Sequence, residues 1–233
     1  MALPPFKGAA MTQVQIINLG LAQISQAPIT SLSDGSVQAD AANTAWIPCL
    51  QEVLRGNNWP FATVIEDLVE VVGYTPPTGW QFAYVYPVNA LSVWKVSDDF
   101  TDSKSKGQDF RKIYVPSLAA QVILTNCLDA GVEYTYYVSD TNMFDADFIS
   151  MLAYRLAAAM AMPLNADADQ AINMMKIYMG LLSDAQRQSS YENNVNNGQS
   201  VDTIVNARVS GNNGANGSVS IGGMTFDQFN QGN

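Results

Sequence analysis

Apolar residues near the start of the chain recur at spacings of three and four, a pattern typical of one face of an amphipathic helix. The residues of this stripe are Val14, Ile17, Leu21 and Ile24. Thr12 is a suitable N-cap, because its hydroxyl oxygen accepts a hydrogen bond from the first helical turn. We predict a helix that begins after Thr12 and ends at Pro28, since proline has no backbone N–H to donate.

A polar turn at residues 31–35 separates this helix from a second helical pattern. Ser36 is the expected N-cap of the second helix, and Gly56 is expected to end it as a left-handed C-cap. Pro48 lies inside the pattern and should kink the helix, because the hydrogen bond to the carbonyl of Thr44 is lost. The sequence therefore predicts two consecutive helices as the first part of a bundle.

Between residues 62 and 138 the helical period gives way to short runs of β-branched and aromatic residues, which favour strands. The predicted strands span residues 64–72, 82–86, 91–96, 110–115, 121–125 and 132–138. Residues 97–108 are polar and contain a glycine, so they are expected to form a loop. The pattern predicts one small antiparallel sheet between helical segments.

The helical period returns after residue 139. One helix is predicted to begin at Asp140 or Thr141 and to end at Pro163. It contains the longest apolar run of the chain, residues 148–164, which carries Arg155 near its middle. Because this run is shorter than the ~20 residues of a membrane span, we interpret it as a buried helix.

A last helix is predicted over residues 168–188, and its acidic first turn suits the helix dipole. Residues 193–233 are dominated by Asn, Gly, Ser and Gln, a composition that offers little apolar surface to bury. We predict that this tail lies along a partner protein. Its candidate partner-binding residues are Val201, Ile204, Val205, Val209, Ile221, Met224, Phe226 and Phe229.

Taken together, the patterns predict an α+β fold: an antiparallel helical bundle with an inserted small antiparallel β domain and a long extended C-terminal tail. The expected segments are an N-terminal arm (residues 1–11), the first part of the bundle (12–61), the β domain (62–138), the second part of the bundle (139–192) and the tail (193–233). The N-terminal arm has no apolar run of the kind found in signal peptides.

Charge and composition narrow the classes of function. The net charge of −10 at pH 7 argues against sequence-independent binding of duplex DNA, which needs clustered Lys and Arg. The chain has no His, which excludes Ser-His-Asp and Cys-His nucleophilic pairs and every His-ligated metal site. Cys49 and Cys127 lie in apolar stretches and are interpreted as buried free thiols, as in a reducing cytoplasm. We therefore expect no enzyme, no catalytic residue, no metal site and no cofactor.

The remaining charged groups give weak signals. Asp140, Asp145 and Asp147 lack the central glycine and closing glutamate of a calcium loop, so we interpret them as helix caps. Spacing alone does not exclude paired carboxylates for glycoside chemistry. The basic cluster consists of Lys95, Lys104, Lys106, Arg111 and Lys112. It is either a solvated sheet edge, where Lys prevents edge pairing, or a contact with a partner or passing nucleic acid.

Three aromatic residues are predicted to anchor the core. Trp59 and Phe61 follow the second helix and are expected where that helix meets the sheet. Trp80 opens an alternating aromatic run, Trp80-Gln81-Phe82-Ala83-Tyr84, which is more typical of a sheet face than of a base-stacking platform.

The order of short motifs along the chain resembles a known family. The motifs are Pro28-Ile29-Thr30-Ser31-Leu32, a helix with internal Pro48, Leu54-Arg55, Trp59-Pro60-Phe61-Ala62, Gly79-Trp80-Gln81-Phe82-Ala83-Tyr84, Pro87, Leu91-Ser92-Val93, Ile123-Leu124-Thr125, Tyr134, Phe144 and Phe148, Leu152-Ala153-Tyr154-Arg155-Leu156-Ala157, and Met162-Pro163-Leu164. Together they resemble tail tubular protein A, the head-to-tail adaptor family of short-tailed bacteriophages. The resemblance covers roughly residues 12–192, and it depends on the order of the motifs more than on any single one.

The resemblance implies a structural virion protein and no enzymatic activity. The family forms a homo-oligomeric ring, typically of about twelve copies, that docks under the portal protein and receives the tail nozzle protein. Genomic DNA passes through the lumen without specific binding, and no membrane is involved. Lys104, Lys106, Arg111 and Lys112 then become candidates for contact with DNA or the nozzle. The chain would be assembled in the host cytoplasm and would end up in the virion tail, at the head-to-tail interface.

Two departures from the family pattern and two alternatives accompany this expectation. The second helix is poor in basic residues, and the Asn/Gly-rich extension after residue 192 is long. Another head-completion or tail-terminator protein is the first alternative. A tail-associated glycan-degrading enzyme is the second.

Overall fold

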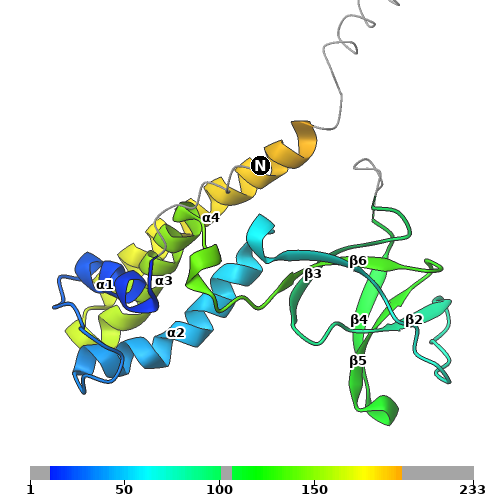
Figure 1. Cartoon of the computed structure of the whole chain (residues 1–233), viewed down its shortest axis with the longest axis horizontal. Helices are drawn as coiled ribbons and strands as arrows, with labels where there is room; N and C mark the ends of the chain where they lie inside the picture. Colours follow the sequence, from blue (N-terminus) through cyan, green and yellow to red (C-terminus); the bar gives the residue numbers. More distant parts are fainter. Residues whose placement is uncertain (1–10, 101–106, 196–233) are drawn as a thin grey trace, which may run out of the picture. The chain divides into compact units, whose positions relative to one another are not determined.

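The structure is a computed structural model that describes residues 11–100 and 107–195 (Figure 1). The side chains of residues 190–195 are not part of this description. The predicted N-terminal arm lies almost entirely outside the described residues, and so does the predicted tail.

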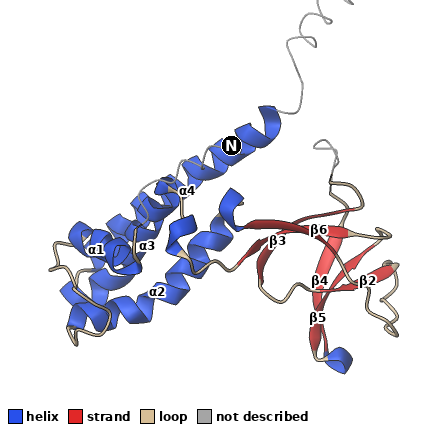
Figure 2. Ribbon diagram, viewed as in Figure 1, coloured by secondary structure: helices blue, strands red, loops and turns tan. Residues whose placement is uncertain are grey.

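Helices and antiparallel sheets both contribute to the described chain, which confirms the predicted α+β class (Figure 2). The helices are α1 (Gln13–Gln23), α2 (Val37–Gly56), α3 (Ala146–Asn165) and α4 (Ala168–Val195). The strands are β1 (Thr63–Asp67), β2 (Phe82–Val85), β3 (Ala90–Ser97), β4 (Phe110–Val115), β5 (Ala120–Thr125) and β6 (Gly131–Tyr136). The strands thus fall between α2 and α3 in chain order, as the sequence predicts.

The start of α1 is built as predicted, but its end comes earlier. Thr12 forms a capping box: its hydroxyl oxygen accepts from the backbone N–H of Gln15, and its own N–H donates to the Gln15 side chain. The helix ends at Gln23 instead of Pro28. Ser25 adopts a left-handed conformation with φ of 57°, which turns the chain out of the helix before the proline is reached.

The second helix also differs from its prediction at the C-terminal end. Ser36 caps α2 as expected, and the helix continues through Pro48 to Gly56. Gly56 is not a left-handed C-cap, because it remains helical and Asn57 is the C-cap. A Cβ atom at Gly56 would lie 2.9 Å from Cδ1 of Leu182 on α4. The glycine therefore serves close packing against α4 and not chain reversal.

The predicted third helix is shorter at its start and longer at its end. Residues Thr141–Met143 form a separate turn of 3₁₀ helix, and α3 begins at Ala146. Pro163 lies inside the last turn of α3, and the helix ends two residues later with Ala166 in a left-handed conformation. A proline near the end of a helix removes only one backbone hydrogen bond and leaves the last turn intact.

The last two helices differ in how apolar they are and in where they end. Of the helices that the structure describes, α3 alone is long and apolar enough to cross a membrane, and half of its most apolar window is buried inside the protein. The final helix extends to Val195, beyond the predicted end near residue 188. Its buried Tyr178 packs in the same core as Phe148 of α3.

The β region forms two three-stranded antiparallel sheets instead of the single predicted sheet. Their strand orders are β1-β6-β3 and β2-β5-β4. The predicted strand at residues 64–72 ends at Asp67, because the chain crosses there from one sheet to the other. The N–H of Leu68 still donates to Ala130 beside β6, whereas the N–H of Val71 donates to Ala83 on β2.

The β region has its own two cores. The larger one takes residues from both sheets, including Tyr84 and Ile123 from one and Val96 and Val132 from the other. The smaller one covers the other face of the β2-β5-β4 sheet. Trp80 is partly buried there, against a cluster that contains Ala83 and Leu124. The helices share a third, larger core that includes residues from α1, α2, α3 and α4.

Candidate functional site

Four aromatic rings meet where the chain leaves the helical core and where it returns. Trp59 is only 4% exposed, and its ring packs edge-on to Phe148 with 5.1 Å between centroids. Phe61 is partly buried and lies 5.0 Å from Phe148 and 5.6 Å from Phe144. We call Trp59, Phe61, Phe144 and Phe148 the junction cluster. It joins the segment that precedes β1 to the start of α3 and the residues just before it.

Side-chain hydrogen bonds stabilise the same junction. The indole N–H of Trp59 donates to the carbonyl of Val53, 2.9 Å away, so the ring is fixed against the last turns of α2. The amide of Asn58 donates to Glu133 on β6 at 2.6 Å. Thr63, the first residue of β1, donates from its hydroxyl to the Trp59 carbonyl at 2.6 Å. These contacts fix the point at which the helical core passes into the β region.

A charged pair lies between the helices. Arg155 of α3 and Glu52 of α2 approach to 2.7 Å, and their hydrogen bond raises the pKa of Arg155. The Nε atom of Arg155 is buried and has no hydrogen-bond partner among the described residues. Burial raises the pKa of Cys49 to about 11 and that of Tyr178 to about 12. Both groups stay protonated at neutral pH, so the thiol is poorly suited to act as a nucleophile.

The basic cluster is dispersed as far as it is described. Arg111 and Lys112 are both exposed on β4, but consecutive strand residues point to opposite faces of a sheet. The ammonium of Lys112 lies 3.9 Å from the ring centroid of Tyr86, and that of Lys95 lies 5.1 Å from the ring centroid of Phe100. Lys104 and Lys106 lie outside the described residues. Arg111 and Lys112 therefore do not form one basic patch.

The candidate partner-binding residues of the tail also lie outside the described residues. They are Val201, Ile204, Val205, Val209, Ile221, Met224, Phe226 and Phe229. Within residues 11–100 and 107–195, no three Cys, Asp or Glu side chains gather in a way that could hold a metal ion.

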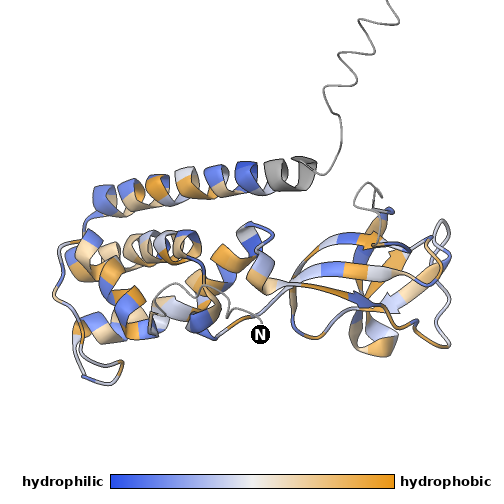
Figure 3. Cartoon of the chain, turned by 45° about the horizontal axis from the view of Figure 1, so that its top comes forward, coloured by the Kyte–Doolittle hydropathy of each residue, from blue (hydrophilic) through white to orange (hydrophobic). Residues whose placement is uncertain are grey.

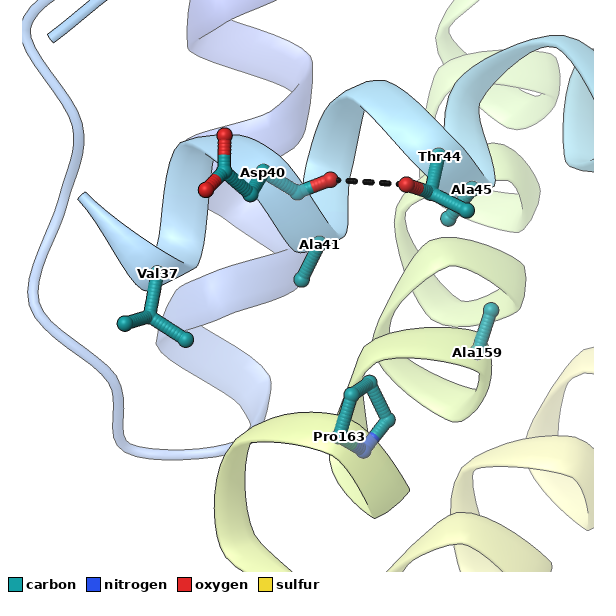
Figure 4. Close-up of a pocket in the computed structure, with 7 residues that line it drawn as sticks. All are labelled: Val37, Asp40, Ala41, Thr44, Ala45, Ala159 and Pro163. Carbon is teal, nitrogen blue, oxygen red and sulfur yellow. Dashed lines mark hydrogen bonds between the residues drawn. The ribbon is translucent and has the colours of Figure 1, made fainter. Parts of the chain in front are cut away.

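An apolar groove between α2 and α3 is the surface feature that sequence reasoning missed (Figure 4). Its volume is about 450 Å³. The lining residues are Val37, Ala41 and Ala45 on α2 and Ala159 and Pro163 on α3, with Asp40 and Thr44 beside them. The Thr44 hydroxyl donates to the backbone carbonyl of Asp40 at 2.9 Å, so its hydrogen is already used within α2.

The groove arises from the small size of its lining residues. Ala41, Ala45 and Ala159 leave a space between two helices that larger side chains would fill. Val37 remains 66% exposed at one end of the groove. The signal in the sequence is the spacing of four between Val37, Ala41 and Ala45, which places these residues on one face of the second helix.

No protein-family model matches this chain, and the search of curated proteins finds no sequence that matches it.

Proposed function

We propose that this chain is a structural virion protein that forms a ring adaptor between the portal and the tail nozzle of a short-tailed bacteriophage. The ring lines the channel through which the genome leaves the head. The portal protein binds one face of the ring, the nozzle protein binds the other, and the DNA passes without specific contacts.

The observation that supports this proposal most is the junction cluster. The Trp59-Pro60-Phe61-Ala62 motif and the pair Phe144 and Phe148 are far apart in the sequence, yet their rings lie within about one ring diameter of each other. Both belong to the set of motifs that resembles the adaptor family. The contact between these two motifs supports the resemblance, because both motifs lie at the ends of the β region, which is inserted between two pairs of helices.

The organisation of the described chain also suits an assembly role. The helical core and the β region each have a separate hydrophobic core, so the chain presents two differently built surfaces to neighbours. Several large apolar side chains remain exposed on both, among them Val72, Val88 and Met179. Exposed apolar side chains of this kind are typical of protein contacts when they gather on one surface.

Another head-completion or tail-terminator protein would need the same kinds of contact surface. It would differ from the proposed adaptor in where its ring binds in the virion. A glycan-degrading tail enzyme would need a pair of carboxylates across a cleft wide enough for a sugar. Asp40 lines the groove described above, and no other carboxylate of the described residues lines it. The groove therefore gives this alternative no support.

Loss of the chain from the phage that encodes it tests the proposal. Electron microscopy should show filled heads without tails, or heads that have leaked DNA. Purified full-length chain added to these heads should bind at the portal vertex and restore tail attachment. Tailed, infectious particles in the absence of the chain would contradict the proposal, and normal tails with unchanged heads but lost glycan degradation would favour the enzyme.

A further inference from the structure

One flank of α4 carries large apolar side chains that remain about half exposed. Ile172 is 50% exposed and Met179 is 55% exposed, and Lys176 lies exposed between them. Residues spaced by three, four and seven share one side of a helix. We call Ile172, Lys176 and Met179 the α4 stripe. Figure 3 shows apolar and polar residues alternating along this helix.

The dimensions of the α4 stripe match those of the α2–α3 groove. Seven residues of helix separate Ile172 from Met179, which corresponds to about 10.5 Å along the axis. Eight residues separate Val37 from Ala45 along the groove, or about 12 Å. Two large apolar side chains at this spacing would therefore enter opposite ends of a groove that is lined mainly by alanine, valine and proline.

The charges of the two surfaces are complementary as well. Asp40 is exposed and lines the groove, next to Ala41 in the sequence and one helical turn before Thr44. Lys176 occupies the middle of the α4 stripe, and neither residue takes part in an ion pair among the described residues. An acid beside an apolar groove and a base within an apolar stripe would fix the direction in which the two surfaces dock.

We propose that the α4 stripe of one copy docks into the α2–α3 groove of the next copy, with Lys176 paired to Asp40. This inference rests on the proposed ring function and names the contact that builds the ring. The stripe and the groove are different surfaces, so the contact is head-to-tail. Repetition of a head-to-tail contact gives a closed ring, or an open filament if the rotation does not close.

The contact is small. Stable interfaces bury about 800 Å² on each partner, and three side chains in a shallow groove supply only part of that area. The same contact therefore forms weakly in solution and accumulates only at high local concentration, as on a template. Because the contact is weak, an experiment that detects it has to trap it covalently as it forms.

Covalent trapping of the full-length chain gives that readout. Thr44→Cys beside the groove and Ser183→Cys one turn beyond Met179 place one thiol on each surface, and the native Cys49 and Cys127 are buried. A short bismaleimide should produce a ladder of oligomers on a denaturing gel. The matched control replaces Thr44→Cys with Ala22→Cys, an exposed position on α1 outside the groove, and should give no ladder.

Charge reversal then tests the pairing. In the Thr44→Cys/Ser183→Cys chain, Asp40→Lys or Lys176→Glu alone should lower the oligomer yield about threefold to tenfold. A mixture of the two single variants should recover the yield, because each contact in an alternating chain is again oppositely charged. Asp40→Lys also weakens α2, whose first turn favours acids, but mixing cannot repair that loss. Arg55→Glu, exposed on α2 outside the groove, should leave the yield unchanged.

Unchanged yields in both reversed variants, or no recovery in the mixture, would overturn the proposed contact. The virion experiment above separates this outcome from a failure of the proposed function. Tailless heads in the virion experiment, together with oligomer yields that charge reversal does not change, would mean that the ring is built through another surface. Recovery in the mixture together with normal tails in the absence of the chain would mean a self-association that serves another purpose.

Discussion

At the scale of single residues, Trp59 shows how one side chain connects distant parts of the chain. Its ring is buried against Phe148, and its N–H satisfies the carbonyl of Val53. Truncation would remove ring burial, an edge-to-face contact and a buried hydrogen bond at once. The side chain therefore contributes more to stability than its area alone indicates.

We expect Trp59→Ala to lower the free energy of unfolding by about 3–5 kcal/mol, because it leaves a cavity in a core that cannot fully collapse. Trp59→Phe keeps most of the ring and loses the hydrogen bond, so it should cost about 1–3 kcal/mol. Tyr114→Ala, at a position that is 61% exposed, is the aromatic control and should cost little. Urea unfolding measures all three, and equal losses for Trp59→Ala and Tyr114→Ala would show that the ring is not a core anchor.

Residue patterns predicted the N-caps of the helices better than their ends. Thr12 and Ser36 cap as expected because the signal is local: a hydroxyl oxygen lies one turn before the backbone N–H from which it accepts. Gly56 was misinterpreted because a glycine after a helix serves either chain reversal or close packing. The close approach of Leu182 decides between them, and that residue lies far along the chain.

At the scale of elements, the space around the glycines of α1 and α4 shows how closely each helix packs on its neighbours. A Cβ at Gly20 of α1 would lie 3.0 Å from the backbone oxygen of Ala153 on α3, which cannot move without shifting the helix. A Cβ at Gly180 of α4 would meet nothing within 4 Å. Both glycines are helical, so the gain in helix propensity on substitution by alanine is the same at the two sites.

The pair therefore makes a matched test of packing. Gly180→Ala should raise the free energy of unfolding by about 0.5–1 kcal/mol. Gly20→Ala should lower it by about 1–3 kcal/mol, because the added methyl group separates α1 from α3. Thermal or urea unfolding of both variants measures the difference. A stabilising effect of Gly20→Ala would show that the two helices are not in close contact at this point.

The division of the strands into two sheets could not be predicted from the sequence. The β-branched run at residues 64–72 is continuous, and nothing in its composition marks the point where the chain leaves one sheet for the other. That point is determined by long-range pairing, with Glu66 opposite Val132 on β6 and Glu70 opposite Tyr84 on β2. The α2–α3 groove was missed for the same reason, since it exists only where two helices meet.

At the scale of the whole molecule, charge constrains what the proposed ring does to DNA. Each chain carries a net charge of −10 at pH 7, so about twelve copies would carry 12 × −10, or about −120. Like charge repels the phosphate backbone. Arg111 and Lys112 on opposite faces of a strand do not make a basic track.

The full-length chain should therefore bind non-specific duplex DNA negligibly at ~150 mM salt. Fluorescence anisotropy with a labelled duplex measures this, and binding that appears only at low salt would be consistent with a few isolated Lys or Arg contacts. Tight binding at physiological salt would contradict the proposal of a channel through which DNA slides, and it would turn attention to Lys104 and Lys106.

Assembly of the chain depends on single residues, on helices and on the net charge of the whole molecule. The contact proposed between the α4 stripe and the α2–α3 groove is small, and the high net charge opposes the approach of identical chains. We therefore expect the isolated full-length chain to be mainly monomeric at micromolar concentration and to form rings only on a portal template. Sedimentation velocity measures the first part, and the second is measured by adding portal-containing heads to the same sample. A stable ring in the absence of the portal would mean that larger surfaces than the groove hold the copies together.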